Sequence, residues 1–334
     1  MSVQIDVAVV GATRLVGEAL VEALEERDFP LARLHLLDSG DAVGQALPFR
    51  GRNLRVGDQQ RFDFGEVRLV FLVEERDATC RERAVAAGCL LVDLSASRPL
   101  DEQPCVVAQV NAGLLAAPQA PLSIASPQPE AVALAIALEP IKQLMQLQRV
   151  TVTACLPVSS RGRAGVGELA RQTTELLNAR PLQPRLFGRQ IAFNLLAQTD
   201  DSDPQGHTRQ ERRLQDELRQ LLALPDLAVS VTFVQVPVFF GESLVVSLLG
   251  RRAVDVAALS AALEAAPGLE LAEAGDYPSA VEDAVGQDVI HVARLRRGLS
   301  DPCEVNLWIV SDNVRKGAAL NAVHSGELLI KRYL

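Results

Sequence analysis

The stretch Val7–Leu24, VAVVGATRLVGEALVEAL, decides the first half of the fold. Its opening run Val7–Val10 is continuously apolar, which is typical of a strand buried on both faces of a parallel sheet. Gly11 ends the run, and from Leu15 to Leu24 the apolar residues recur at helical spacing. Strand, glycine turn and helix together indicate the start of a βαβ unit. The unpaired N–H groups and positive dipole at the start of such a helix suit a phosphate.

The turn allows two interpretations. A dinucleotide-binding turn of the form G-x-x-G-x-x-G would have glycine at 11, 14 and 17, but position 14 is Arg14. An ordinary βα turn therefore stays an equal alternative. If a dinucleotide binds here, we expect it to contact Gly11, Thr13, Arg14, Leu15 and Val16.

A second short strand, 34–37, ends at Asp38. In a dinucleotide-binding unit the end of this strand faces the adenosine ribose, where an acid accepts from the 2′-hydroxyl and repels a 2′-phosphate. Asp38 and Asp41 therefore favour NAD over NADP, with a polar loop of no such role as the alternative.

The composition and charge of the chain indicate its domain organisation and argue against several classes of partner. The 334 residues should form about two domains, and with 48% hydrophobic but only 4% aromatic residues the core is aliphatic. A net charge of −9 without a strongly basic segment argues against a nucleic-acid partner or an anionic membrane. There is no apolar run of membrane-spanning length and no signal peptide. The five scattered cysteines lack C-x-x-C spacing, which predicts reduced thiols, a cytoplasmic location and no metal site.

Strand and helix patterns alternate over residues 4–128 and predict a parallel sheet. Its further strands are expected at 67–73, 89–94, 106–107 and 122–125, with a helix at 76–87. A second sheet is expected from strands at 150–155, 229–238, 243–249, 289–295 and 305–310, with helices at 165–178, 208–222 and 254–266. The last helix is expected at 316–329.

Five segments in order resemble the aspartate-semialdehyde dehydrogenase family over nearly the whole chain. The most specific is LWIVSDNVRKGAA at 307–319, which is similar to the segment that leads into the family's C-terminal helix. The others are VAVVGATRLVG at 7–17, VVAQVN at 106–111, IAFN at 191–194, and YPS with AVG at 277–286. Within the family, the chain is most similar to the Usg-type paralogues.

The resemblance implies an α/β chain with two domains. Residues 1–128 would form a Rossmann-type parallel sheet that the C-terminal segment 315–334 rejoins, and 129–314 an α+β domain that pairs two subunits in a homodimer. The family reduces an acyl phosphate to an aldehyde with NADPH, or runs in reverse. A cysteine attacks the carbonyl, a glutamine assists, a histidine moves the proton and an arginine holds the substrate carboxylate.

All four central positions are changed in this chain. The cysteine position is Pro129, the glutamine Leu156, the arginine Gln235 and the histidine Glu242. Glutamine cannot form the charged bidentate pair with a carboxylate. An ionised glutamate repels an anionic substrate and acts as a base only if burial raises its pKa. No catalytic residue is assigned; Glu130 and Cys155 are the alternative reactive groups nearby.

The positions that would support the family's substrate and cofactor are partly kept and partly changed in this chain. Arg98 resembles the family's phosphate-binding arginine and Arg213 replaces a family lysine, with a solvated surface arginine as the alternative for each. Asn321 is kept in the last helix as a weak cofactor contact. Glu74 and Glu75 replace a glycine pair after the third strand, which disfavours a pyrophosphate there.

The sequence therefore predicts a chain that has lost the family reaction and has a role in binding or association, as a homodimer or with an active paralogue. No cofactor is assigned, although NAD(P) is allowed and NAD favoured. The alternative is an oxidoreductase of changed specificity that uses Glu242 or Cys155 on a small aldehyde or acyl phosphate with NAD(P).

Overall fold

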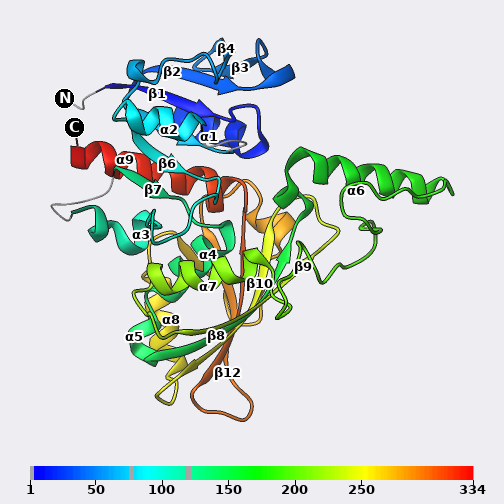
Figure 1. Cartoon of the computed structure of the whole chain (residues 1–334). Coiled ribbons are helices and arrows are strands. Elements are labelled where there is room, and N and C mark those ends of the chain that lie inside the picture. The colour runs from blue at the N-terminus through cyan, green and yellow to red at the C-terminus, as the bar shows by residue number, and fades with distance from the viewer. Residues whose placement is uncertain (1–3, 75–78, 117–121, 334) are drawn as a thin grey trace. The chain divides into compact units, whose positions relative to one another are not determined.

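A computed structural model describes residues 4–74, 79–116 and 122–333. The chain divides into two compact units (Figure 1): residues 1–128 with 318–334, and residues 129–317. None of the helices in the described ranges is long and apolar enough to cross a membrane.

The first unit contains a seven-stranded sheet in the order β3-β4-β2-β1-β5-β6-β7. The strands are β1 (Ile5–Val10), β2 (Leu31–Asp38), β3 (Ala46–Phe49), β4 (Arg52–Asp58), β5 (Leu69–Leu72), β6 (Leu90–Asp93) and β7 (Ser123–Ala125). All neighbours are parallel except the edge pair β3–β4, which is antiparallel. Strand order reverses at β1, so the crevice between the carboxyl ends of β1 and β5 is the switch point where Rossmann-type folds bind ligands.

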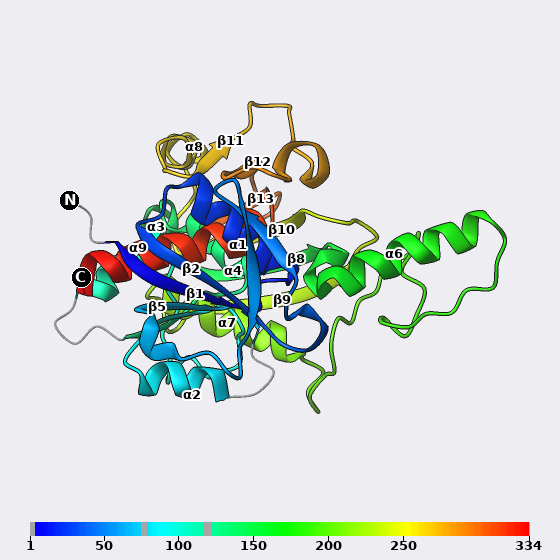
Figure 2. The same ribbon diagram turned by 90° about the horizontal axis from the view of Figure 1, so that it is seen from above.

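Helices cover both faces of this sheet (Figure 2). On one face α1 (Leu15–Glu26) and α9 (Asn321–Tyr333) pack against Val7 and Val9. On the other, α2 (Thr79–Ala86) packs against Ala8 and Val10. Successive strand residues point to opposite faces, so a strand between two helical layers is apolar at every position. The Rossmann-type interpretation of the opening stretch is confirmed. A short helix, α3 (Ala108–Asn111), also belongs to this unit.

The second unit contains a six-stranded sheet in the order β11-β12-β13-β10-β8-β9. Its strands are β8 (Leu147–Leu156), β9 (Ala228–Gln235), β10 (Glu242–Gly250), β11 (Leu269–Leu271), β12 (Ile290–Arg297) and β13 (Glu304–Ser311). Its helices are α4 (Pro129–Leu138), α5 (Lys142–Met145), α6 (Gly162–Leu177), α7 (Arg209–Leu221) and α8 (Val256–Glu264). Alternate residues of β8 and β10 are buried, while those between them are partly open, with Val245 at 49% exposure. One face of this sheet is therefore covered and the other is not.

Several predicted elements need correction. Strands β3, β4 and β11 were not predicted, because most of their residues are at least partly exposed and none of them contains a buried apolar run. The predicted strand 106–107 is wrong: in the described part of the chain this segment contributes a single parallel bridge, between Cys105 and Ala125. The predicted last helix begins as a π-helical turn, Arg315–Leu320, and continues as α9. The predicted helix 76–87 corresponds to α2, and its first residues, 76–78, lie outside the described ranges.

Candidate functional site

The glycine turn after β1 keeps the two glycines that its backbone requires. Gly11 has φ +83°, which is unstrained only for glycine, and a Cβ on Gly17 would lie 2.2 Å from the carbonyl oxygen of Gly11. Arg14 has φ −73° and ψ 157°, an extended backbone that any residue adopts. The turn can therefore lose its middle glycine without strain.

Most polar groups of the turn are engaged within the protein. The N–H groups of Gly11 and Ala12 donate to the carbonyl of Leu37. Helix α1 has no side-chain cap, so the N–H groups of Leu15 and Val16 stay open to an anion.

Asp38, the predicted ribose acceptor, lies at the end of β2 but is buried. Its Oδ1 accepts from the Ser39 N–H at 2.8 Å, and its Oδ2 accepts from the Thr13 hydroxyl at 2.6 Å. A ribose hydroxyl would therefore compete with Thr13 for this carboxylate. Asn321 is also buried, and its Nδ2 donates to the Val106 carbonyl and the Ser126 hydroxyl.

Arg14 forms ion pairs across the switch point. Its Nε lies 2.6 Å from a Glu74 carboxylate oxygen, and its guanidinium lies 3.7 Å from Asp38. Because Glu74 follows β5, the pair joins the carboxyl ends of β1 and β5, where a pyrophosphate would lie. Glu75, the second predicted acid, lies outside the described residues.

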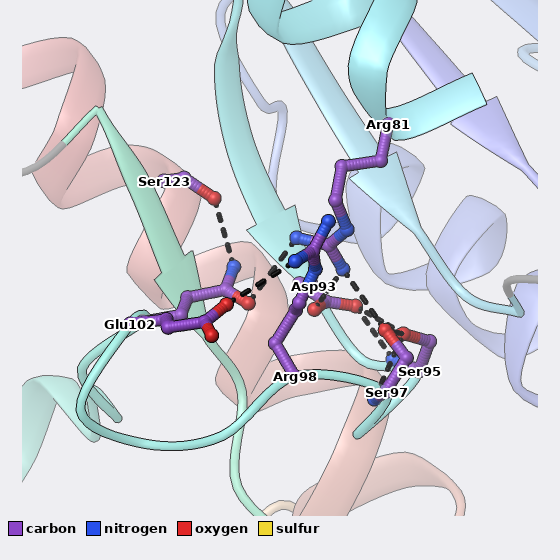
Figure 3. Close-up of polar contacts among 8 residues, drawn as sticks. Arg81, Asp93, Ser95, Ser97, Arg98, Glu102 and Ser123 are labelled. Atoms are coloured by element: carbon purple, nitrogen blue, oxygen red, sulfur yellow. Dashed lines mark hydrogen bonds and ion pairs between the residues drawn. The ribbon is translucent and has the colours of Figure 1, made fainter. Parts of the chain in front are cut away.

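Two arginines lie near the end of β6, and the buried one is not the predicted one (Figure 3). Arg98 is half-exposed and its guanidinium lies 3.2 Å from Glu102. Arg81, on α2, is buried; it pairs with Asp93 and donates to Gln103 at 3.2 Å. Sequence reasoning missed Arg81, because nothing in the polar segment TCRERAVA distinguishes the buried Arg81 from its neighbour Arg83.

The register of the second sheet brings three of the four changed positions side by side. Glu242 pairs with Ser311, and Leu156 pairs with Gln235. Ser243 pairs with residue 155, which places Glu242 beside Leu156. Gln235, Leu156, Glu242 and Ser311 therefore form one line across β9, β8, β10 and β13, which we call the cross-strand row. Paired residues of adjacent strands share a face of the sheet, so these side chains point to the same side.

The polar members of the cross-strand row are buried and present acceptor atoms. Gln235 Nε2 donates to the Leu156 carbonyl at 2.7 Å, while its Oε1 has no partner among the described residues. The Ser311 hydroxyl donates to Glu242 Oε1 at 2.5 Å. This arrangement offers no cation for a substrate carboxylate at the position where the family has arginine.

The first turn of α4 supplies the remaining residues. Pro129 is its first residue, a position that suits proline, and a Cβ on Gly317 would lie 2.5 Å from the Pro129 Cβ. Glu130 is buried, and its side chain lies within hydrogen-bonding reach of Glu242. Burial and then the charge of Glu130 raise the pKa of Glu242 well above its usual value. Burial raises the pKa of Glu130 to about 7.

Arg213 and Cys155 lie near the cross-strand row without entering it. Arg213 Nε, on α7, donates to the buried carboxylate of Glu217 at 2.7 Å, so an internal acid balances its charge. Cys155 precedes Leu156 on β8 and therefore points to the opposite face of the sheet. Burial raises the pKa of the Cys155 thiol, which makes it a poor nucleophile. Within the described residues no group of three or more His, Cys, Asp and Glu side chains could hold a metal ion.

The glycine turn and the cross-strand row both lie in segments that match known protein domains. Residues 6–133 match the NAD binding domain of semialdehyde dehydrogenases, and residues 138–316 match their dimerisation domain. The chain is 56% identical to a USG-1 protein homolog of Azotobacter vinelandii over 99% of both chains, and 37% identical to aspartate-semialdehyde dehydrogenase 2 of Vibrio cholerae over 100% of both.

Solved structures agree with these matches. A probable aspartate-semialdehyde dehydrogenase from Pseudomonas aeruginosa is 53% identical, with a TM-score of 0.96 over 99% of this chain and 100% of that one. The Vibrio cholerae aspartate semialdehyde dehydrogenase II, in complex with ASA, is 37% identical, with a TM-score of 0.96 over 100% of both chains. With two family domains and full-length relatives above 30% identity, this chain belongs to the semialdehyde dehydrogenase family, and its relatives include both aspartate-semialdehyde dehydrogenases and USG-1 protein homologs.

Proposed function

We propose that this member of the family has lost the acyl-transfer reaction and works by binding or association through its dimerisation domain. The observation that carries this proposal is the chemistry of the cross-strand row and of the first turn of α4. Pro129 replaces the thiol, and Gln235 and Glu242 replace the arginine and the histidine. In the row, the buried atoms without a hydrogen-bond partner among the described residues are Gln235 Oε1 and Glu242 Oε2, and these acceptors suit neither a thioester nor an anionic substrate.

A relocated thiol does not rescue the reaction in this proposal. Cys155 is the nearest cysteine in sequence to the row, but strand alternation turns it away from Glu242 and Gln235. Its raised pKa keeps it as the neutral thiol near pH 7, and the thiolate is the attacking form.

The turn after β1 fits a dinucleotide only in part. The uncapped start of α1 suits a pyrophosphate, and bound NAD(P) would supply hydride chemistry. Glu74 places a carboxylate at the same crevice, and Asp38 already accepts from Thr13 and Ser39. We propose that any dinucleotide binds weakly, and that NAD is preferred because Asp38 would repel a 2′-phosphate.

Association would use the open face of the six-stranded sheet. Val245 lies near the middle of β10, between β8 and β13, yet half of its surface is exposed. A sheet face left uncovered by the chain's own helices, in a segment that matches a dimerisation domain, suits an interface that a partner covers. We propose a second copy of this chain as that partner and leave an active paralogue as the alternative.

Two measurements test the proposal. With aspartate semialdehyde, phosphate and NAD or NADP, the protein should form no reduced nicotinamide, whereas the Vibrio cholerae aspartate-semialdehyde dehydrogenase 2 serves as the active control. Turnover that persists in Cys155→Ser but vanishes in Glu242→Gln would overturn the proposal in favour of redirected chemistry. In sedimentation equilibrium the protein should be a dimer, and Val245→Arg should convert it to a folded monomer.

The alternative function, an oxidoreductase of changed specificity, would use Glu242 or Cys155, and the buried Glu130 lies within hydrogen-bonding reach of Glu242. A pKa of about 7 for Glu130 suits a general acid or base at neutral pH. This alternative requires a dinucleotide, so a rise in melting temperature with micromolar NAD or NADP would favour it.

A further inference from the structure

We propose that Glu130 and Glu242 share one proton. The shared proton forms a hydrogen bond between the start of helix α4 and the start of strand β10, so that the stability of the second unit depends on pH. The proposal does not depend on the loss of the family reaction, because it concerns the stability of the fold.

The geometry of the pair requires a hydrogen between the two carboxyl groups. Glu242 is 0% exposed and Glu130 5% exposed. Glu242 Oε1 accepts from the Ser311 hydroxyl, but Glu242 Oε2 receives no N–H or O–H from the described residues. Two buried carboxylates within hydrogen-bonding reach cannot both be ionised. They repel each other strongly in a site of low dielectric, and burial removes the water that would stabilise their charges.

The charges around the pair do not neutralise it. Helix α7 presents Glu217, whose charge also raises the pKa of Glu130, and Arg213 on the same helix is paired with Glu217. After β13, the charge of Asp312 raises the pKa of Glu242.

Two further charged residues, Asp312 and Lys316, follow Ser311 closely in the sequence. The Asp312 carboxylate accepts from the N–H groups of Gly286, Val314 and Arg315. Lys316 is buried on the adjoining π-helical turn. The negative charges of Glu217 and Asp312 each raise the pKa of one member of the pair and so favour the shared proton.

The direction of the pH response follows from these shifts. Folding raises the pKa of both carboxyl groups, so the folded chain binds protons more tightly than the unfolded chain. The stabilisation from the pair is complete below the unfolded pKa of about 4.3. It is lost as pH rises through the folded pKa of Glu130, about 7, and further as Glu242 ionises.

The test compares melting temperatures of the full chain at several pH values. Wild type should melt roughly 5 °C lower at pH 8 than at pH 5. Glu242→Gln replaces the shared proton with a permanent amide donor, so this variant should melt above wild type at pH 8 and close to it at pH 5. Glu273→Gln, an exposed glutamate of the same unit, is the matched control and should follow wild type throughout. The double variant Glu130→Gln/Glu242→Gln should gain nothing over Glu242→Gln alone, because only one proton is shared.

Parallel pH profiles for wild type and Glu242→Gln would overturn the proposal, as would independent gains in the double variant. A measurement on the unaltered protein covers the case in which Glu242→Gln does not fold. Infrared spectra at pH 7 should contain the absorption of a protonated carboxyl group that disappears as pH rises. A spectrum without that absorption at pH 7 would refute the shared proton.

Discussion

The glycine turn of the first unit and the cross-strand row of the second differ in where their charges lie. At the turn, the changed residue Arg14 pairs with Glu74, and both side chains are more than one-third exposed. In the row, Glu242 and Gln235 are buried, and so is Glu130 beside them. Exposed ion pairs are worth about 1 kcal/mol or less, whereas a buried charge left unpaired costs several. Substitutions of the charged residues at the turn should therefore change the free energy of unfolding little, while a substitution that leaves a buried charge unpaired beside the row should change it strongly.

The largest effect is expected from Arg213→Met, next to the row. The substitution removes the Arg213 charge that is paired with the fully buried carboxylate of Glu217, so the free energy of unfolding should fall by about 3–5 kcal/mol. Denaturant unfolding at pH 7 measures it. Arg212→Met is the matched control, because Arg212 is exposed and pairs at the surface with Asp203. Equal losses of unfolding free energy in both variants would show that burial of the ion pair does not determine the cost of removing its arginine.

The two regions also differ in how far sequence alone could describe them. At the turn, local patterns were sufficient: the apolar run Val7–Val10 and the helical spacing after Leu15 depend only on neighbours in the chain. The replacement of four central residues, each in a segment that resembles the family, stays a prediction from the sequence.

Long-range geometry could not be read in the same way. The approach of Glu130 to Glu242 depends on how α4 packs on the sheet, and the line from Gln235 to Ser311 depends on the register of four strands. The pairing of Arg14 with Glu74 is a side-chain contact between separate strand ends, which no local pattern specifies. Sequence periodicity reports burial of a face but not which residues of separate elements meet.

A second prediction tests whether Gly17 at the turn is required for the fold or for a ligand. Gly17→Ala should lower the free energy of unfolding by about 2–3 kcal/mol, because the new Cβ would meet the carbonyl of Gly11, which is backbone and cannot rotate away. Thermal or urea unfolding without any dinucleotide measures this loss. Gly167→Ala, at an open position inside α6, should instead be neutral or stabilise by up to about 1 kcal/mol. If Gly17→Ala were neutral, the glycine would serve a ligand rather than the packing of α1 on β1.

A third prediction concerns the exposed ion pair itself. Arg14→Gly/Glu74→Gly removes both charges from the crevice, and the affinity for NAD should rise up to about fivefold, as expected for an exposed pair worth about 1 kcal/mol or less. Calorimetric titration with NAD and NADP measures it. Arg14→Gly alone removes the cation but keeps the Glu74 carboxylate in the crevice, and should not improve binding. If wild type responds to NAD and Arg14→Gly abolishes the response, Arg14 is a phosphate ligand and not a partner of Glu74.

The smallest effect is expected from a substitution of Arg98. This prediction distinguishes Arg98, the predicted phosphate ligand, from Arg81, the buried arginine beside it. Arg98 is 40% exposed and its guanidinium lies 3.2 Å from Glu102, so Arg98→Met should change the free energy of unfolding by about 0.5 kcal/mol or less. Arg81→Met, by contrast, would leave Asp93 buried without its cation and should cost about 3 kcal/mol. Denaturant unfolding with and without inorganic phosphate checks both variants. If phosphate stabilises wild type but not Arg98→Met, the exposed arginine has kept its ligand; an equal response in both would leave Arg98 as a solvated surface residue.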